Sequence, residues 1–263
     1  MSASMAVLAI SWAGVGAFCQ AAVPAASASP SFEVSTVKVN TSGNGGSQSS
    51  MTNGMYIASN VTLTNLMQYS AYGIPQRRIV NGPKWLYETR FDIQAKMDSA
   101  TLEQTQKMSN TERRSVVRGM FQRLLAERFK MATHWETREL PVYVLVTAKD
   151  GAKLQTTMLT DSGTHISSER GTLTAKGVTM ADLARTLTQE SGNELGRDVV
   201  DKTDLPGRYD VELKWTPTDS DPSAEPGPSI FTAVQEQLGL RLESTKGPVE
   251  VLVVDRIEMP SEN

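Results

Sequence analysis

The sequence is short of the residues that most often carry chemistry. Its 263 residues include one cysteine, Cys19, and two histidines, His134 and His165. Two histidines are too few for a histidine-based zinc site, which needs three or four ligands. The net charge of −3 argues against a general nucleic-acid binder, because such a protein needs a basic surface to displace counterions. We therefore expect no cofactor, no metal and no nucleic-acid partner.

The first 28 residues lack any charged side chain. The apolar run from Ala6 to Phe18 is too short to span a bilayer comfortably and has the length of a signal-peptide core. Ala26-Ser27-Ala28 then offers the small-x-small pattern that a signal peptidase cleaves. The pattern departs from the usual one in that no Lys or Arg precedes the apolar run. We expect residues 1–28 to be a signal peptide and the protein to be exported, either periplasmic or secreted, with no stable membrane span after cleavage.

The single cysteine lies inside this leader. Phe18 stands where a lipoprotein signal needs a small residue, which disfavours lipidation of Cys19. Cleavage after Ala28 would remove Cys19. The mature chain would then have no disulfide, no thiol nucleophile and no thiolate metal site.

Three phrases of the sequence occur twice in the same order. Residues 56–63 (YIASNVTL) return as 173–180 (LTAKGVTM), and 90–93 (RFDI) return as 208–211 (RYDV). Residues 141–146 (PVYVLV) return as 248–253 (PVEVLV). Three ordered matches indicate one structural unit written twice.

The spacing of apolar residues predicts the same elements in both units. Leu63, Leu66 and Met67 begin a helical stripe over 63–72, and Met180 begins its counterpart. Thr179 with Asp182 resembles a capping box, and Thr62 holds the same place in the first unit. A second helix is expected over about 112–128, with a counterpart that begins at Ser229. Each unit should end in a Val-rich strand that is buried on both faces, and the first unit in two separate strands, 129–135 and 142–148.

The expected fold class is α+β: a tandem repeat of two small units, each a mixed or antiparallel sheet with two helices on one face. Polar and Gly-rich stretches set the expected boundaries. These are a signal peptide (1–28), an N-terminal strand and flexible loop (29–54), a first repeat (55–148), a linker (149–171) and a second repeat (172–260) with a flexible loop at 216–229.

Further phrases follow one another in an order that resembles a known family. They are 61–63 (VTL), 71–74 (AYGI), 82–86 (GPKWL), 124–130 (LLAERFK), 136–143 (ETRELPVY), 200–203 (VDKT), 231–240 (FTAVQEQLGL) and 246–250 (KGPVE). Over about 32–263 the chain is similar to the exported "soil-associated" proteins of acidobacterial genomes, a domain of unknown function. The resemblance implies export, and related domains sometimes follow a sensor-type membrane metallopeptidase domain. It implies no catalytic residues.

A weaker similarity is to the short N-terminal domain of secretins and TonB-type receptors. That domain also enters a helix through Val-Thr-Leu, here Val61-Thr62-Leu63, and has a small βαβ sheet. It serves as a protein-interaction module, so this similarity implies a protein partner.

Asp92 and Asp210 hold equivalent places in the two repeats. If a pseudo-twofold axis brought them together, they would form a carboxylate dyad with general acid–base potential. Strand alternation also places Arg90 beside Asp92 and Arg208 beside Asp210 on the same faces. A solvated ladder of ion pairs therefore explains both carboxylates without catalysis.

His134 and Glu136 alternate along a predicted strand and would share one face. They could form a base–orienter pair or hold part of a metal site, but a half-exposed strand histidine is the simpler interpretation. His165 lies near Asp161 and Ser162 in the predicted linker, with no element that would position a triad.

The second helix of the first unit carries a run of arginines that could steer an acidic partner or touch an anionic membrane. The interleaved Glu112 and Glu127 equally fit an ordinary solvated helix face. The run comprises Arg113, Arg114, Arg118, Arg123 and Arg128.

These patterns favour a non-enzymatic protein- or peptide-interaction module of the cell envelope. A partner would bind at a sheet edge or in the groove between the units. The alternatives are a hydrolase that uses carboxylates from the two repeats and a sensor or regulatory lobe that acts with a membrane partner.

Overall fold

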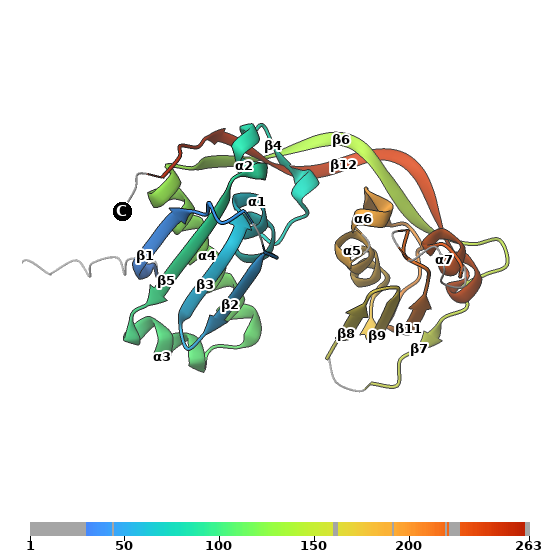
Figure 1. Ribbon diagram of the computed structural model, residues 1–263. Helices are drawn as coiled ribbons and strands as arrows, with labels where there is room; N and C mark the ends of the chain where they lie inside the picture. Colours follow the sequence, from blue (N-terminus) through green and yellow to red (C-terminus); the bar gives the residue numbers. More distant parts are fainter. Residues whose placement is uncertain are drawn as a thin grey trace, which may run out of the picture.

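The computed structural model describes residues 30–43, 45–159, 163–190, 192–218, 220 and 227–260. They form an α+β fold with three four-stranded sheets, which confirms the expected fold class. Figure 1 shows two lobes, each with its own sheet and helices, joined by a long two-stranded ribbon. The predicted signal peptide lies outside the described residues.

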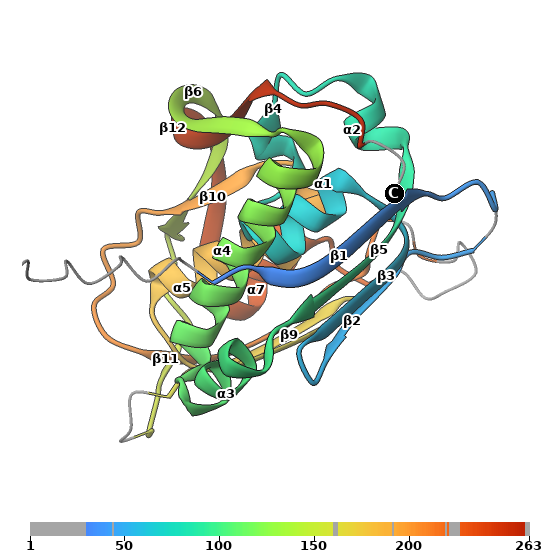
Figure 2. The ribbon, with the colours of Figure 1, turned by 90° about the vertical axis from the view of Figure 1, so that its left-hand side faces the viewer.

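The first lobe has an antiparallel sheet with helices packed on one face (Figure 2). In sheet order its strands are β1 (Phe32–Val39), β5 (Arg90–Met97), β3 (Met55–Thr62) and β2 (Gln48–Thr52). The helix α4 (Asn110–Phe129) and the π-helix η1 (Leu66–Ala71) cover it. Smaller elements are α1 (Leu63–Asn65), η2 (Gln76–Arg78), β4 (Ile79–Val80), α2 (Lys84–Glu88) and α3 (Ser99–Lys107).

Strict alternation along β5 divides the sheet into a buried and an exposed face. Phe91, Ile93 and Ala95 point into the core, whereas Arg90 and Gln94 are exposed. The expected alternation is therefore confirmed. The largest fully buried side chains of this core come from α1, η1, α2, β5 and α4: Leu63, Leu66, Met67, Leu86, Phe91, Ile93, Phe121, Leu125 and Phe129.

The second lobe repeats this layout with a smaller antiparallel sheet. Its strands in sheet order are β7 (Gln155–Thr156), β11 (Tyr209–Lys214), β9 (Thr172–Val178) and β8 (His165–Glu169). Its helices are α5 (Met180–Glu190), α6 (Gly192–Leu195) and α7 (Ile230–Leu238). The N-cap expected at Ser229 is confirmed, because its hydroxyl accepts the Thr232 N–H at 3.2 Å.

A third sheet is shared by the two lobes, and nothing in the sequence pattern indicated it. Its order is β10 (Asp198–Asp201), β6 (Ala132–Thr147), β12 (Leu240–Arg256) and β4. The long strands β6 and β12 run antiparallel over their whole length, so the two strands expected at 129–135 and 142–148 are one. β10 pairs in parallel with the second half of β6, and β4 with the second half of β12.

The ribbon carries apolar side chains from each half of the chain into the other lobe. Leu145 of β6 lies in the core of the second lobe, whereas Leu252 and Val254 of β12 lie in the core of the first. The segments 141–146 and 248–253, which match in sequence, thus exchange places. The lobes consequently do not coincide with the predicted boundaries of 55–148 and 172–260 at these strands.

Residues 251–254 of β12 are buried on both faces, as expected of a Val-rich strand, whereas Tyr143, Val144 and Val146 in the matching segment of β6 are only partly buried. Leu252 and Val254 face the first lobe, and the alternate residues Val249, Val251 and Val253 pack with Val142 in a small separate cluster. This cluster gives the ribbon an apolar core of its own.

Two segments expected to be irregular contain short strands. The predicted linker 149–171 contributes β7 and β8, and the predicted loop before residue 54 contributes β2. Most of their side chains are exposed, so these edge strands lack the alternation of apolar and polar residues by which a half-buried strand is recognised.

The two lobes share one hydrogen-bonding arrangement at equivalent places. Asn60 and Gly177 both have positive φ, and their N–H groups donate to Asp92 Oδ1 at 3.0 Å and Asp210 Oδ1 at 2.9 Å. The helix that follows begins with a capping box in each case, at Thr62 and at Thr179, as expected. The duplication of a whole unit stays a prediction.

Within the described ranges, no helix has the length and apolar character of a membrane span.

Substitution of Leu252 by alanine should destabilise the first lobe, although this residue belongs to the last strand. Its side chain is 1% exposed. Loss of a buried leucine side chain costs about 2–5 kcal/mol. Urea unfolding followed by circular dichroism measures the loss. The exposed neighbour Glu250→Ala is the matched control, with an expected change within about 0.5 kcal/mol. Equal effects of the two substitutions would show that β12 does not complete the first core.

Candidate functional site

The structure does not bring Asp92 and Asp210 together. Asp92 lies on β5 in the first lobe and Asp210 on β11 in the second (Figure 1). Asp92 accepts hydrogen bonds from Asn40 Nδ2 and the Asn60 N–H. The pKa of Asp210 is lowered, mainly by a hydrogen bond from the Thr157 side chain and then by the Gly177 N–H. A shared-proton dyad would raise the pKa of one carboxyl, so this arrangement fits two structural carboxylates.

The candidate pair on β6 is also divided between different partners. His134 Nδ1 lies 2.9 Å from Asp255 of β12, and both side chains are about half exposed. Glu136 pairs with Arg138 at 2.9 Å, and the hydrogen bond from this arginine lowers the pKa of Glu136. His165 is exposed at the start of β8. Its expected neighbours Asp161 and Ser162 lie outside the described residues.

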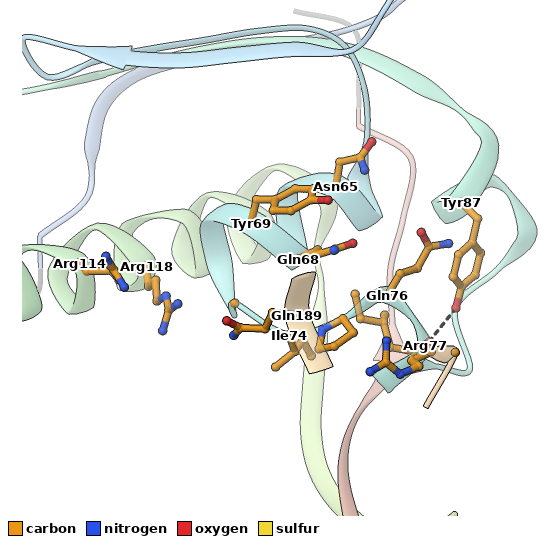
Figure 3. A pocket seen from close by; sticks show the side chains of 14 residues that line it. Asn65, Gln68, Tyr69, Ile74, Gln76, Arg77, Tyr87, Arg114, Arg118 and Gln189 are labelled. Atoms are coloured by element: carbon orange, nitrogen blue, oxygen red, sulfur yellow. Dashed lines mark hydrogen bonds between the residues drawn. The ribbon is translucent and has the colours of Figure 1, made fainter. Parts of the chain in front are cut away.

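Side chains from both lobes converge instead on a cleft of about 1070 Å³ beneath the ribbon. α1, η1, η2, α2 and α4 supply the wall from the first lobe, and α5 and the turn before β10 supply the wall from the second. Figure 3 shows an elongated row, with Arg114 and Arg118 at one end, Arg77 and Tyr87 at the other, and Gln189 between them. The lining residues are Asn65, Gln68, Tyr69, Gly73, Ile74, Pro75, Gln76, Arg77, Ile79, Tyr87, Arg114, Arg118, Gln189 and Gly196.

The wall from the first lobe is built around the π-helix η1. π-helices are rare, and they often occur at functional sites. Gln68 and Tyr69 of η1 line the cleft, and Tyr69 is 72% exposed, an unusual position for an aromatic ring. Gln122 Nε2 of α4 donates to the Ala71 carbonyl at 2.9 Å, which holds η1 against α4.

Two arginines one helical turn apart on α4 line the same end of the cleft. Arg114 is exposed and Arg118 is partly buried, and neither forms a hydrogen bond or ion pair with any residue in the described part of the chain. Their neighbour Arg113 differs, because its Nε donates to the Thr105 carbonyl at 3.0 Å. Arg113 thus links α3 to α4. The guanidinium groups of Arg114 and Arg118 have no such contact among the described residues and line the cleft.

Gly73 makes room for one of these cations. Its φ of +70° is a conformation that glycine adopts without strain. A Cβ atom at this position would lie 2.1 Å from Nη2 of Arg118. The Arg118 guanidinium therefore packs directly against the backbone at Gly73, and a larger residue would displace it.

An ion-pair cluster joins the lobes beside the cleft. Asp198, at the start of β10, lies 2.6 Å from Arg77 Nη2 and 2.7 Å from Arg78 Nε, both on η2. The Asp198 side chain is 6% exposed, and each arginine side chain is 27% exposed. Arg77 Nη2 also donates to the Thr188 carbonyl near the end of α5 at 3.3 Å. We call this cluster of Arg77, Arg78 and Asp198 the latch.

The cleft is lined mainly by groups that can form hydrogen bonds. The described lining residues offer three arginines, four side-chain amides and two tyrosines, but no carboxylate, imidazole or thiol. Burial raises the pKa of Tyr87, and its hydroxyl donates to the Ile79 carbonyl at 3.1 Å. Elsewhere in the described ranges, no group of three His, Cys, Asp or Glu side chains is placed to bind a metal ion.

Sequence reasoning did not find this set of residues. The arginine run on α4 was recognised, but two of its members are now distinguished from the others by their position in the cleft. The Arg77-Arg78 pair and Gln68, Tyr69 and Gln189 carry no motif. The signal that could have identified the latch is the unusual Pro75-Gln76-Arg77-Arg78 segment between two apolar stretches.

Replacement of Asp198 by alanine should destabilise the protein by about 3–5 kcal/mol, because it leaves two partly buried guanidinium groups without a counter-charge. Thermal and urea unfolding measure the change. The control is Asp255→Ala, which removes an exposed partner of His134 and should cost about 0–1 kcal/mol. A combined Asp198→Leu, Arg77→Met and Arg78→Met variant should recover most of the loss, because the uncompensated charges are gone. If Asp198→Ala costs no more than Asp255→Ala, the latch does not hold the lobes together.

Comparison with known proteins gives one match. No curated protein and no solved structure is similar enough to match the chain. A family model described as "Protein of unknown function (DUF3738)" matches residues 64–257, a range that contains every lining residue of the cleft, the latch and the ribbon. The match covers more than half of the sequence, and the chain therefore belongs to the DUF3738 family of proteins of unknown function.

Proposed function

We propose that this protein is a non-enzymatic binding module that holds an extended peptide segment of a partner protein in the cleft between its lobes. The observation that carries the proposal is the convergence of Gln68, Tyr69 and Gln189, side chains with free hydrogen-bonding or contact surface, from two lobes on one elongated cleft. Convergence of polar side chains on one concave site is a usual mark of a binding site.

The side-chain amides of the cleft suit a peptide backbone. Gln68, Gln76 and Gln189 make no side-chain hydrogen bond within the described part of the chain. Each amide group can donate and accept, as a peptide group does, so an extended segment could satisfy all three. Tyr69 adds an exposed ring against which an apolar side chain could pack.

The cleft is a stronger candidate than a sheet edge. β2 lies at an edge of the first sheet, and all five of its residues are exposed. Edge strands of this kind can accept an added strand, but β2 has only five residues and is mostly polar, so it offers a short edge with little apolar surface. The cleft offers side-chain amides together with the exposed ring of Tyr69.

The hydrolase alternative has less support. Its four candidate carboxylate and imidazole groups lie on β5, β11 and β6, and none of them lines the cleft. The sensor or regulatory alternative is compatible with the proposal, because a lobe that binds a peptide can report its presence to a membrane partner.

Selection of binding peptides tests the proposal directly. A phage-displayed library of random 12-residue peptides should yield binders to the full chain, and Gln189→Trp should weaken them about tenfold or more, because the ring takes space in the cleft and the amide is lost. The binding of resynthesised, fluorescein-labelled peptides is measured by fluorescence anisotropy. The matched control is Gln104→Trp, at an exposed position on α3 away from the cleft, which should leave binding unchanged.

The possible outcomes distinguish binding in the cleft from binding elsewhere on the protein. Binders that respond to Gln189→Trp and not to Gln104→Trp support the cleft as the binding site. No binders, or binders equally affected by both substitutions, would contradict it. Thermal unfolding of both variants shows whether either change acts through stability.

We further propose that the protein acts in the cell envelope after export, on the basis of the apolar leader and the Ala26-Ser27-Ala28 pattern. Expression with the native leader in a Gram-negative host should place the protein in the periplasmic fraction. Mass spectrometry should then find Ser29 as its first residue. A cytoplasmic protein that retains residues 1–28 would contradict export, and Ala28→Arg, which should block cleavage, provides the control for processing.

A further inference from the structure

The arginine pair of the cleft has a cost in the absence of a ligand. Arg114 and Arg118 are spaced i, i+4 on α4, so their side chains are neighbours on one helix face. Like charges at this spacing destabilise a helix slightly. Within the described part of the chain, no carboxylate lines the cleft to offset them.

The glycine at position 73 lets one of the two cations lie close to the backbone. A Cβ atom there would lie 2.1 Å from Nη2 of Arg118. A guanidinium that has no partner in the described part of the chain is available for bidentate recognition of a carboxylate, whose two oxygens match its parallel N–H groups.

The far end of the cleft adds to the positive charge. Arg77 and Arg78 share the single carboxylate of Asp198, so the latch as a whole is also cationic. Arg77 lines the cleft, which places positive charge at both ends of the elongated row in Figure 3. The protein as a whole carries a net charge of −3, so this local charge runs against the global one.

We propose that the ligand of the cleft is an acidic peptide segment, with Asp or Glu side chains bound by Arg114 and Arg118. This inference rests on the proposed function and specifies its ligand class. The carboxylates pair with the two arginines, the amides of Gln68 and Gln189 bind the peptide backbone, and Tyr69 contacts an apolar neighbour. The global charge of −3 disfavours nucleic acid as an alternative anion.

The test uses the fluorescein-labelled 12-residue peptides that bind the full chain, each also made with Asp and Glu replaced by Asn and Gln. Acidic residues should be enriched among the binders, and their replacement should weaken binding at least tenfold. Arg114→Gln and Arg118→Gln should each weaken the acidic form about tenfold, since one charge-assisted contact is worth roughly that factor. Neither substitution should further weaken the amide form of the peptide. Binding of the acidic form should also fall as salt is raised.

The matched control is the double variant Lys38→Gln and Lys96→Gln. These exposed lysines lie on the sheet of the first lobe and not in the cleft, and their loss changes the net charge by the same amount as the loss of both arginines. Binding of the acidic peptide should stay unchanged in this variant. An equal loss in this variant and in a variant that carries both Arg114→Gln and Arg118→Gln would mean that general charge attraction, and not the arginine pair, binds the peptide.

Failure of this inference differs from failure of the proposed function. Binders that respond to Gln189→Trp but are not acidic, or that tolerate Arg114→Gln and Arg118→Gln, would overturn the acidic ligand and leave a peptide-binding cleft. An oligogalacturonate, added as an anionic glycan, should compete poorly. If it displaces the peptide at lower concentration than an unlabelled copy of the peptide itself, the ligand class is a glycan and the proposal is overturned.

Discussion

The shared carboxylate of Asp198 is the constraint on which the relation between the lobes depends. A carboxylate that is 6% exposed must be paired, because an unpaired buried charge costs several kcal/mol. Arg77 and Arg78 supply the pairing from the opposite lobe, with short and directional contacts to both carboxylate oxygens. The latch thus fixes the contact between η2 and the start of β10, in addition to the shared sheet and the Arg77–Thr188 hydrogen bond. Arg77 belongs both to the latch and to the cleft wall, so the latch also positions one part of that wall.

The ribbon is a second link between the lobes, besides the latch. It is continuous, but the number of strands varies along its length. β10 flanks β6 only from Val142 to Leu145, and β4 flanks β12 only at Leu252 and Val253. Between these points the ribbon is two strands wide, and a two-stranded section is marginally stable by itself. Pro141, Gly247 and Pro248 lie in this section, where open edges tolerate residues that weaken a central strand. This section thus has the fewest flanking strands, and the latch provides a separate link between the lobes.

Features encoded within a few residues were predictable from the sequence. The capping box at Thr179, the N-cap at Ser229 and the alternation along β5 each depend on a spacing of two or three residues, which one sequence displays. The shared sheet was not predictable, because alternation indicates which face of a strand is buried but not which strand lies beside it. A run that is buried on both faces, such as 251–254, shows that both faces of the strand are covered but not which strand pairs with its edge. The cleft was harder still, because its residues come from segments as far apart as Asn65 and Gly196 and share no motif.

The polar residues of the two lobes are used in two different ways, and this difference separates scaffold from site. Asp92 and Asp210 accept hydrogen bonds from the N–H groups of residues with positive φ, so each carboxylate stabilises a bend of the chain. Arg114 and Arg118 have no such partner among the described residues, yet one of them occupies a position that a glycine at residue 73 makes possible. Folding alone does not require a cation there, and the helix would be more stable without two like charges one turn apart. A ligand that brings negative charge removes this cost, so its binding energy includes the relief of a repulsion present in the free protein.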